Sequence, residues 1–65
     1  MNIYLNGEVH QTQCSNLFQL IQGLSLEGKR YAVEVNEQII SKNKLEQTII
    51  SESDRIEIIH AVGGG

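Results

Sequence analysis

The chain has 65 residues, 40% of them hydrophobic, which is enough for one small domain and too little for a second. Five Lys and Arg residues against eight Asp and Glu residues give a formal net charge of −3. Because the phosphate backbone is bound through clustered basic side chains, this balance argues against a nucleic-acid partner. A domain of this size also leaves little room for a deep enzyme cleft.

The composition further points to a cytoplasmic protein. One cysteine cannot form an internal disulfide, and the first residues lack the basic-then-apolar pattern of a secretory signal. Every unbroken apolar run is far shorter than the ~20 residues of a membrane-spanning helix. We therefore expect no membrane partner.

The first predicted element is a β-hairpin. Ile3 and Leu5 lie on one face of an alternating segment, and Asn6-Gly7 follows. Asn-Gly is the strongest short signal for a two-residue turn of type I′, because both central positions need positive φ. Residues 8–13 are expected to return as a more polar strand near a sheet edge.

A short helix is predicted next. Its apolar residues recur with helical spacing and form one buried face: Leu17, Leu20, Ile21 and Leu24. Ser15 is the expected N-cap, because its hydroxyl can accept from free N–H groups of the first turn. Gly23 weakens the end of this helix.

The rest of the chain is predicted to add further strands. Residues 31–36 form a β-branched strand with Val33 and Val35 on one face, and Asn36-Glu37 is a tight turn into a short strand, 38–40.

Residues 41–47 indicate a turn or a single helical turn, with Leu45 pointing inward. After a polar loop at 51–54, Ile56 and Ile58 should face the core from a final strand. The isoleucines of this strand need burial, so we expect it at the centre of the sheet, beside the first strand.

These elements predict an α+β domain in which one helix crosses a mixed sheet. The predicted core is Ile3, Leu5, Leu17, Leu20, Ile21, Val33, Val35, Ile56 and Ile58. We place the domain boundary after residue 62 and treat residues 63–65 as a flexible glycine tail.

The closing glycines, Gly63, Gly64 and Gly65, have two interpretations. They can be an inert end or linker. Alternatively, because glycine has no Cβ, they can form a slim tail that threads into a narrow site on another protein and presents a carboxylate there.

The whole chain resembles the small ubiquitin-like sulfur carriers, specifically the carriers of thiamin thiazole synthesis. The most specific matching segments are Val33-Glu34-Val35-Asn36, residues 54–59 and Gly64-Gly65. Two features depart from the family pattern: Ser53 stands where the family usually has glycine, and Gly63 adds a third glycine. The related carriers of molybdopterin synthesis are a second possibility, although they often have prolines before Gly-Gly and this chain has none.

The resemblance implies a β-grasp fold and a protein that is a substrate, not an enzyme. An E1-like adenylyltransferase would use ATP to convert the Gly65 carboxylate to an acyl-adenylate. Sulfur from a cysteine desulfurase or another persulfide donor would then give a thiocarboxylate, which a thiazole synthase would consume. Gly63 and Gly64 would thread the tail, and no catalytic side chain or bound cofactor is implied.

Two other classes of function stay open. A ubiquitin-like modifier would be conjugated to target lysines through Gly65. An interaction module would carry an inert glycine tail. Detection of a thiocarboxylate, as opposed to a ladder of larger conjugates, separates a carrier from a modifier.

The remaining candidate residues are weighed against structural roles. Cys14 precedes the predicted helix, where a thiolate is favoured, but a small half-buried side chain is the simpler interpretation. His10 and His60 lie on different strands, and zinc normally needs three or four protein ligands, so we expect no metal site.

The outer side of the sheet offers a candidate docking surface. Ile59 is out of phase with the core and Val62 lies beyond the strand, so both are candidate docking residues beside the tail. Glu34 and Glu57 occupy the same outer phase, where a solvated charged face is the simpler interpretation.

Overall fold

The computed structural model describes residues 1–26 and 30–60, with the side chain of His60 excepted. Five strands, one α-helix and one turn of 3₁₀-helix form in this part of the chain. Their bounds are β1 Asn2–Leu5, β2 Glu8–Gln11, α1 Leu17–Gly23, β3 Tyr31–Val35, β4 Gln38–Ile40, η1 Lys42–Lys44 and β5 Arg55–His60.

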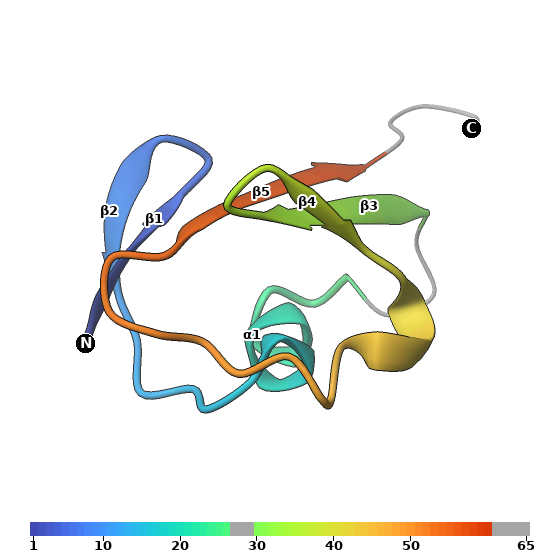
Figure 1. Ribbon diagram of the computed structural model, residues 1–65, viewed down its shortest axis with the longest axis horizontal. Coiled ribbons are helices and arrows are strands. Elements are labelled where there is room, and N and C mark those ends of the chain that lie inside the picture. Colours follow the sequence, from blue (N-terminus) through green and yellow to red (C-terminus); the bar gives the residue numbers. More distant parts are fainter. Residues whose placement is uncertain (27–29, 61–65) are drawn as a thin grey trace.

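The strands form one mixed sheet in the order β2-β1-β5-β3-β4, and α1 lies against one face of it (Figure 1). The final strand β5 is central, parallel to β1 and antiparallel to β3. This is the β-grasp fold, with the last strand beside the first as predicted. No helix in the described ranges is long and apolar enough to cross a membrane.

Both hairpins turn through two residues with positive φ. Asn6 has φ 51° and Gly7 has φ 84°, as a type I′ turn requires, and Leu5 pairs with Glu8. In the second hairpin Asn36 has φ 50° and Glu37 has φ 72°. The predicted turns are therefore both present, although β2 ends at Gln11, two residues before the expected end.

The helix begins one residue later than expected. Asn16, and not Ser15, is the N-cap: its backbone is extended and its side-chain oxygen accepts a hydrogen bond from the Gln19 N–H at 2.9 Å. The Gln19 side chain reaches back to accept from the Ser15 N–H at 2.7 Å. This reciprocal arrangement resembles a capping box, and it requires the acceptor three residues before Gln19.

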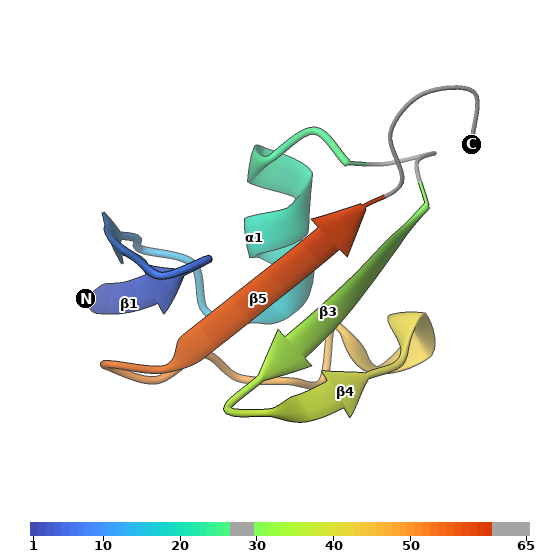
Figure 2. The same cartoon turned by 90° about the horizontal axis from the view of Figure 1, so that it is seen from above.

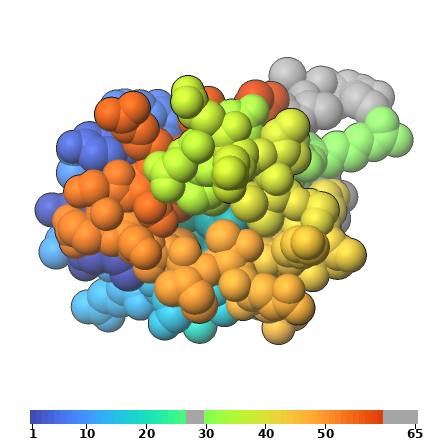
Figure 3. All heavy atoms as spheres, viewed as in Figure 1, coloured from blue at the N-terminus to red at the C-terminus, as the bar shows by residue number. Residues whose placement is uncertain are grey.

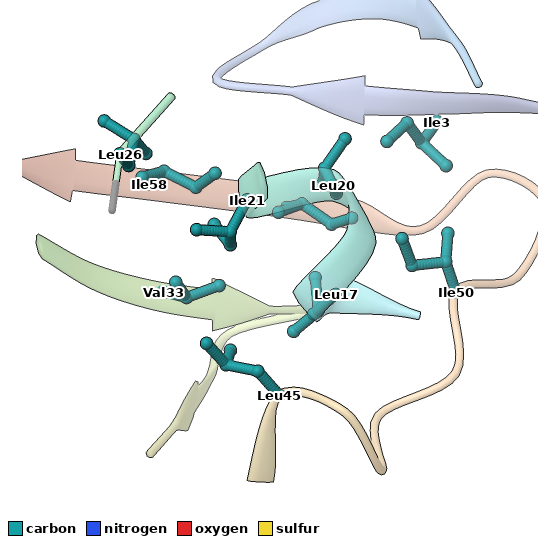
Figure 4. Close-up of a cluster of buried hydrophobic side chains, with 10 residues drawn as sticks. Ile3, Leu17, Leu20, Ile21, Leu26, Val33, Leu45, Ile50 and Ile58 are labelled. Atoms are coloured by element: carbon teal, nitrogen blue, oxygen red, sulfur yellow. The ribbon is translucent and has the colours of Figure 1, made fainter. Parts of the chain in front are cut away.

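The core lies between α1 and the inner face of the sheet (Figure 4). Seven of the nine predicted core residues are buried, whereas Leu5 and Val35 are only half-buried because each ends its strand at a turn. Other buried residues complete the core: Leu26, Leu45 and Ile50. Leu45 points inward as predicted.

The segment between η1 and β5 closes the side of the core that the sheet leaves open. It joins the start of α1 through a hydrogen bond from the Leu17 N–H to the Thr48 carbonyl, at 3.0 Å, and one from the Ile50 N–H to the Ser15 carbonyl, at 3.0 Å. In the space-filling view, this yellow-to-orange segment covers much of α1 (Figure 3). Ile50 is therefore buried, although no regular period in the sequence marks it.

Candidate functional site

The central strand β5 is the element that leads into the end of the chain. Val62 and the three glycines, Gly63, Gly64 and Gly65, lie outside the described residues, so their predicted roles stay predictions. Within the described part, Ile56 and Ile58 on β5 are buried at 0% and 7% exposure. These two side chains anchor the strand in the core on its inner side.

Two asparagines fix β5 from opposite sides. The Asn6 N–H donates to the Ile56 carbonyl at 2.9 Å, and the Asn6 side-chain oxygen accepts from the Ile58 N–H at 2.8 Å. Asn36 repeats this pattern on Arg55, with its N–H on the Arg55 carbonyl at 2.7 Å and its side-chain oxygen accepting from the Arg55 N–H at 3.0 Å. The turns of both hairpins therefore hold the strand that precedes the tail.

The loop before β5 is held by the Asp54 carboxylate. Its two oxygens accept from the Asn36 side-chain amide at 3.1 Å and from the Ser51 N–H at 2.8 Å. Ser53 in the same loop has φ 69°, in the left-handed region that glycine adopts most easily. The turn at the position of the family's usual glycine therefore keeps a left-handed backbone in spite of the serine.

Ile59 lies on the sheet face opposite α1, because it alternates with the buried Ile56 and Ile58. Its side chain is 64% exposed, and it pairs with Ala32 on β3. This exposure makes Ile59 available to a partner, as a docking residue must be. Its docking role and that of Val62 stay predictions.

The same outer face contains a solvent-open hollow of about 530 Å³. Three carboxylates line it, Glu34, Glu37 and Glu57, together with Tyr4 and Arg55. Glu34 and Glu57 were placed on the outer phase from the sequence, but their direct pairing across β3 and β5 was not foreseen. The register between β3 and β5 brings Glu34 and Glu57 together. This register cannot be inferred from the alternation of residues along either strand alone.

The other candidate residues do not converge. Cys14 is half-buried against the core, and its N–H donates to the Thr12 hydroxyl at 3.1 Å. His10 lies on β2 at the sheet edge, and His60 ends β5, paired with Tyr31. No group of three His, Cys, Asp or Glu residues within the described ranges is arranged to hold a metal ion.

Comparison with known proteins assigns the family. A protein-family model described as the ThiS family matches residues 2–65, which is nearly the whole chain. The chain belongs to the ThiS family. The match includes the β-grasp strands, the helix and the closing glycines, and it agrees with the resemblance inferred from the motifs.

Individual relatives support this membership. "Sulfur carrier protein ThiS" of Bacillus subtilis is 41% identical over 46 residues, which are 71% of this chain and 70% of that protein. A thiazole synthase of Magnetococcus marinus is 35% identical over 66 residues, covering all of this chain. The chain spans 20% of the length of that synthase and of the one from Paramagnetospirillum magneticum.

A solved structure shares the fold. The crystal structure of the thiamine biosynthesis protein ThiS from Geobacter metallireducens superposes with a TM-score of 0.82, and the two chains cover each other completely. Their sequence identity is 23%. At this identity the likeness supports the β-grasp architecture.

Proposed function

We propose that this ThiS-family chain is a sulfur carrier protein that supplies sulfur for the thiazole ring of thiamin. The observation that carries the proposal is the family match over residues 2–65, which includes the closing Gly-Gly. The relative from Bacillus subtilis bears the name of a sulfur carrier. The same match favours thiamin synthesis over molybdopterin synthesis.

The proposed chemistry takes place on the carboxylate of Gly65. A carboxylate is a poor electrophile because attack on it must expel an oxide-like leaving group. In the first step a carboxylate oxygen attacks the α-phosphorus of ATP and pyrophosphate leaves, so that the product is an acyl-adenylate.

Sulfur then replaces the adenylate. A terminal persulfide sulfur attacks the acyl carbon, and AMP leaves with the electron pair of the acyl–oxygen bond. A thiol next cleaves the sulfur–sulfur bond of the resulting acyl disulfide. This leaves the thiocarboxylate on Gly65 and a disulfide on the donor side, so electrons balance without another oxidant or reductant.

The carrier contributes no catalytic side chain. It contributes a positioned terminal carboxylate and a narrow tail. Gly64 and Gly65 have no Cβ, which lets the terminus enter a narrow reaction centre, and Gly63 extends its reach. The two asparagine turns bond the backbone of Arg55, Ile56 and Ile58 in β5, the strand that precedes the tail. A protein with this role is a substrate of an E1-like adenylyltransferase.

We further propose three partners: this adenylyltransferase, a thiazole synthase, and a cysteine desulfurase or other persulfide donor. The thiazole synthases that match this chain over 20% of their length support the second, because they contain a related domain within the synthase chain. ATP is used by the activating enzyme, and the carrier itself holds no cofactor.

Intact mass spectrometry tests the function. The purified chain is incubated with the activating enzyme, ATP and a persulfide donor, and the expected product carries one sulfur in place of one oxygen. A variant with one residue appended after Gly65 should form neither adenylate nor thiocarboxylate, because its reactive carboxylate is displaced. Sulfur transfer to the untrimmed extended chain would contradict the proposal, and a ladder of larger conjugates in cell extracts would indicate a protein modifier.

A further inference from the structure

The face of the sheet opposite α1 is uncovered in the described structure. Figure 2 looks down on this face, with β5 and β3 side by side and α1 beneath them. The acidic hollow lies here, where Glu34 of β3 stands directly opposite Glu57 of β5. Like charges directly opposite each other in an antiparallel pair are destabilising.

The hollow has a net negative lining. Glu37, from the turn between β3 and β4, adds a third carboxylate. Arg55 is the one cation among the described residues that line it, so three negative charges face one positive charge. Glu34 is half-buried, which weakens the screening of its charge by solvent.

Exposed apolar side chains lie beside these carboxylates. The strand pairing places Ile39 opposite Glu34 and Ile59 two residues from Glu57 on the same face. Ile39 is 76% exposed, Ile59 is 64% exposed and Tyr4 is 42% exposed. In protein interfaces, the contacts around a hot spot exclude water from it, and exposed apolar side chains beside these carboxylates would do so when a partner binds.

We propose that this face docks the thiazole synthase, and that the hollow receives an arginine or lysine side chain of that enzyme. The inference rests on the proposed function, from which the identity of the partner is taken. The basic character of the docking side chain is inferred from the net negative charge of the hollow. A cation between Glu34 and Glu57 removes their mutual repulsion and forms charge-assisted hydrogen bonds with both carboxylates. An anionic partner surface would be repelled by the same group.

This proposal predicts opposite effects on stability and on binding. Glu34→Gln or Glu57→Gln removes the repulsion in the free chain, so each variant should melt a few degrees higher than the parent. Each should also bind the synthase roughly tenfold more weakly, because one charge of the docking contact is lost. A residue with a purely structural role would not change the two properties in opposite directions.

Glu46→Gln is the matched control. Glu46 is exposed, and its replacement removes the same charge. It belongs to the segment that follows η1, and this segment lies on the same side of the sheet as α1 (Figure 1). This variant should bind the synthase like the parent. Comparison with it separates a local contact from the effect of net charge.

The experiment is calorimetric titration of the synthase with the parent and the three variants, at about 0.1 M and about 1 M salt, where the Debye length falls from roughly 10 Å to 3 Å. The parent should lose more affinity in high salt than the two hollow variants. Unchanged affinity of both hollow variants at low salt would overturn the inference, as would a parent that accepts sulfur but does not bind the synthase. Sulfur transfer to the parent, measured separately by intact mass, tests the proposed function independently.

Discussion

Individual residues with left-handed backbone set the geometry around β5. Asn6 and Asn36 both adopt positive φ, which asparagine tolerates better than most residues, and both use the side chain to bond the β5 backbone. Ser53 adopts φ 69° without being asparagine or glycine. Its conformation therefore costs stability.

Ser53→Gly should stabilise the fold. The left-handed conformation costs an ordinary residue roughly 1–2 kcal/mol, while glycine loses roughly 0.5–1 kcal/mol in backbone entropy. The difference, about 0.5–1 kcal/mol, should raise the melting temperature by a few degrees in a domain of this size. Thermal denaturation followed by circular dichroism measures it. Ser51→Gly is the control and should lower the melting temperature, because positive φ occurs at Ser53 and not at Ser51.

Deletion of Gly65 should abolish adenylation, because the terminal carboxylate then falls one residue short of the reaction centre. Gly63→Ala should have a milder effect, since the tail keeps its length and the Gly64-Gly65 pair is preserved. Cys14→Ser and His60→Gln should have little effect, because neither side chain takes part in the proposed chemistry. ATP–pyrophosphate exchange by the activating enzyme measures all four variants. Equal activity of the deletion variant and of Gly63→Ala would contradict the threading role.

At the scale of elements, β5 has two functions on its two faces. Its inner face carries Ile56 and Ile58 into the core, and its outer face presents Glu57 and Ile59. The same strand therefore contributes to the hydrophobic core on one face and to the proposed docking surface on the other. A change on the outer face should alter binding without unfolding the protein.

Ile59→Glu should weaken binding to the activating enzyme and leave the fold intact. The side chain is 64% exposed, so the new charge stays in water in the free protein but is placed in an apolar contact in the complex. Ile49→Glu is the matched control, since Ile49 is 65% exposed and lies in the segment beside the start of α1. Calorimetric titration should show reduced affinity for the first variant alone. If Ile59→Glu binds like the parent, the docking patch lies elsewhere on the sheet.

At the scale of the whole molecule, stability depends on one small core shared by α1, the sheet and the segment before β5. A domain of about this size buries only about 60% of its unfolded surface, so its net stability is expected to be small. Single deletions of buried volume should therefore have large effects.

Leu20→Ala and Ile58→Ala should each cost roughly 2–5 kcal/mol of unfolding free energy, because each side chain is at most 7% exposed and leaves a cavity when truncated. Ile39→Ala, at a position 76% exposed, should change stability by less than about 0.5 kcal/mol. Urea denaturation gives the three values. Melting of both core variants at the parent's midpoint would show that the assigned faces are wrong.

Local chemistry in the sequence by itself determined most of the elements. The need for positive φ marks Asn6-Gly7 as a turn, helical spacing marks the buried face of α1, and alternation puts Ile56 and Ile58 inside. These signals are readable because each depends on residues within a few positions of one another. The glycine tail and the family motifs were visible for the same reason.

The tertiary structure alone decided what depends on contacts between distant segments. The N-cap falls at Asn16 because Gln19 bonds both Asn16 and Ser15, and because the Thr48 carbonyl accepts from the Leu17 N–H at the start of the helix. Ile50 is buried by tertiary packing, which no periodic pattern in the nearby sequence indicates. Alternation placed Glu34 and Glu57 on the outer phase, but it did not state that β3 and β5 are neighbours or in which register they pair. That register is set by burial of the inner faces of both strands together, and it is what brings the two carboxylates to one hollow.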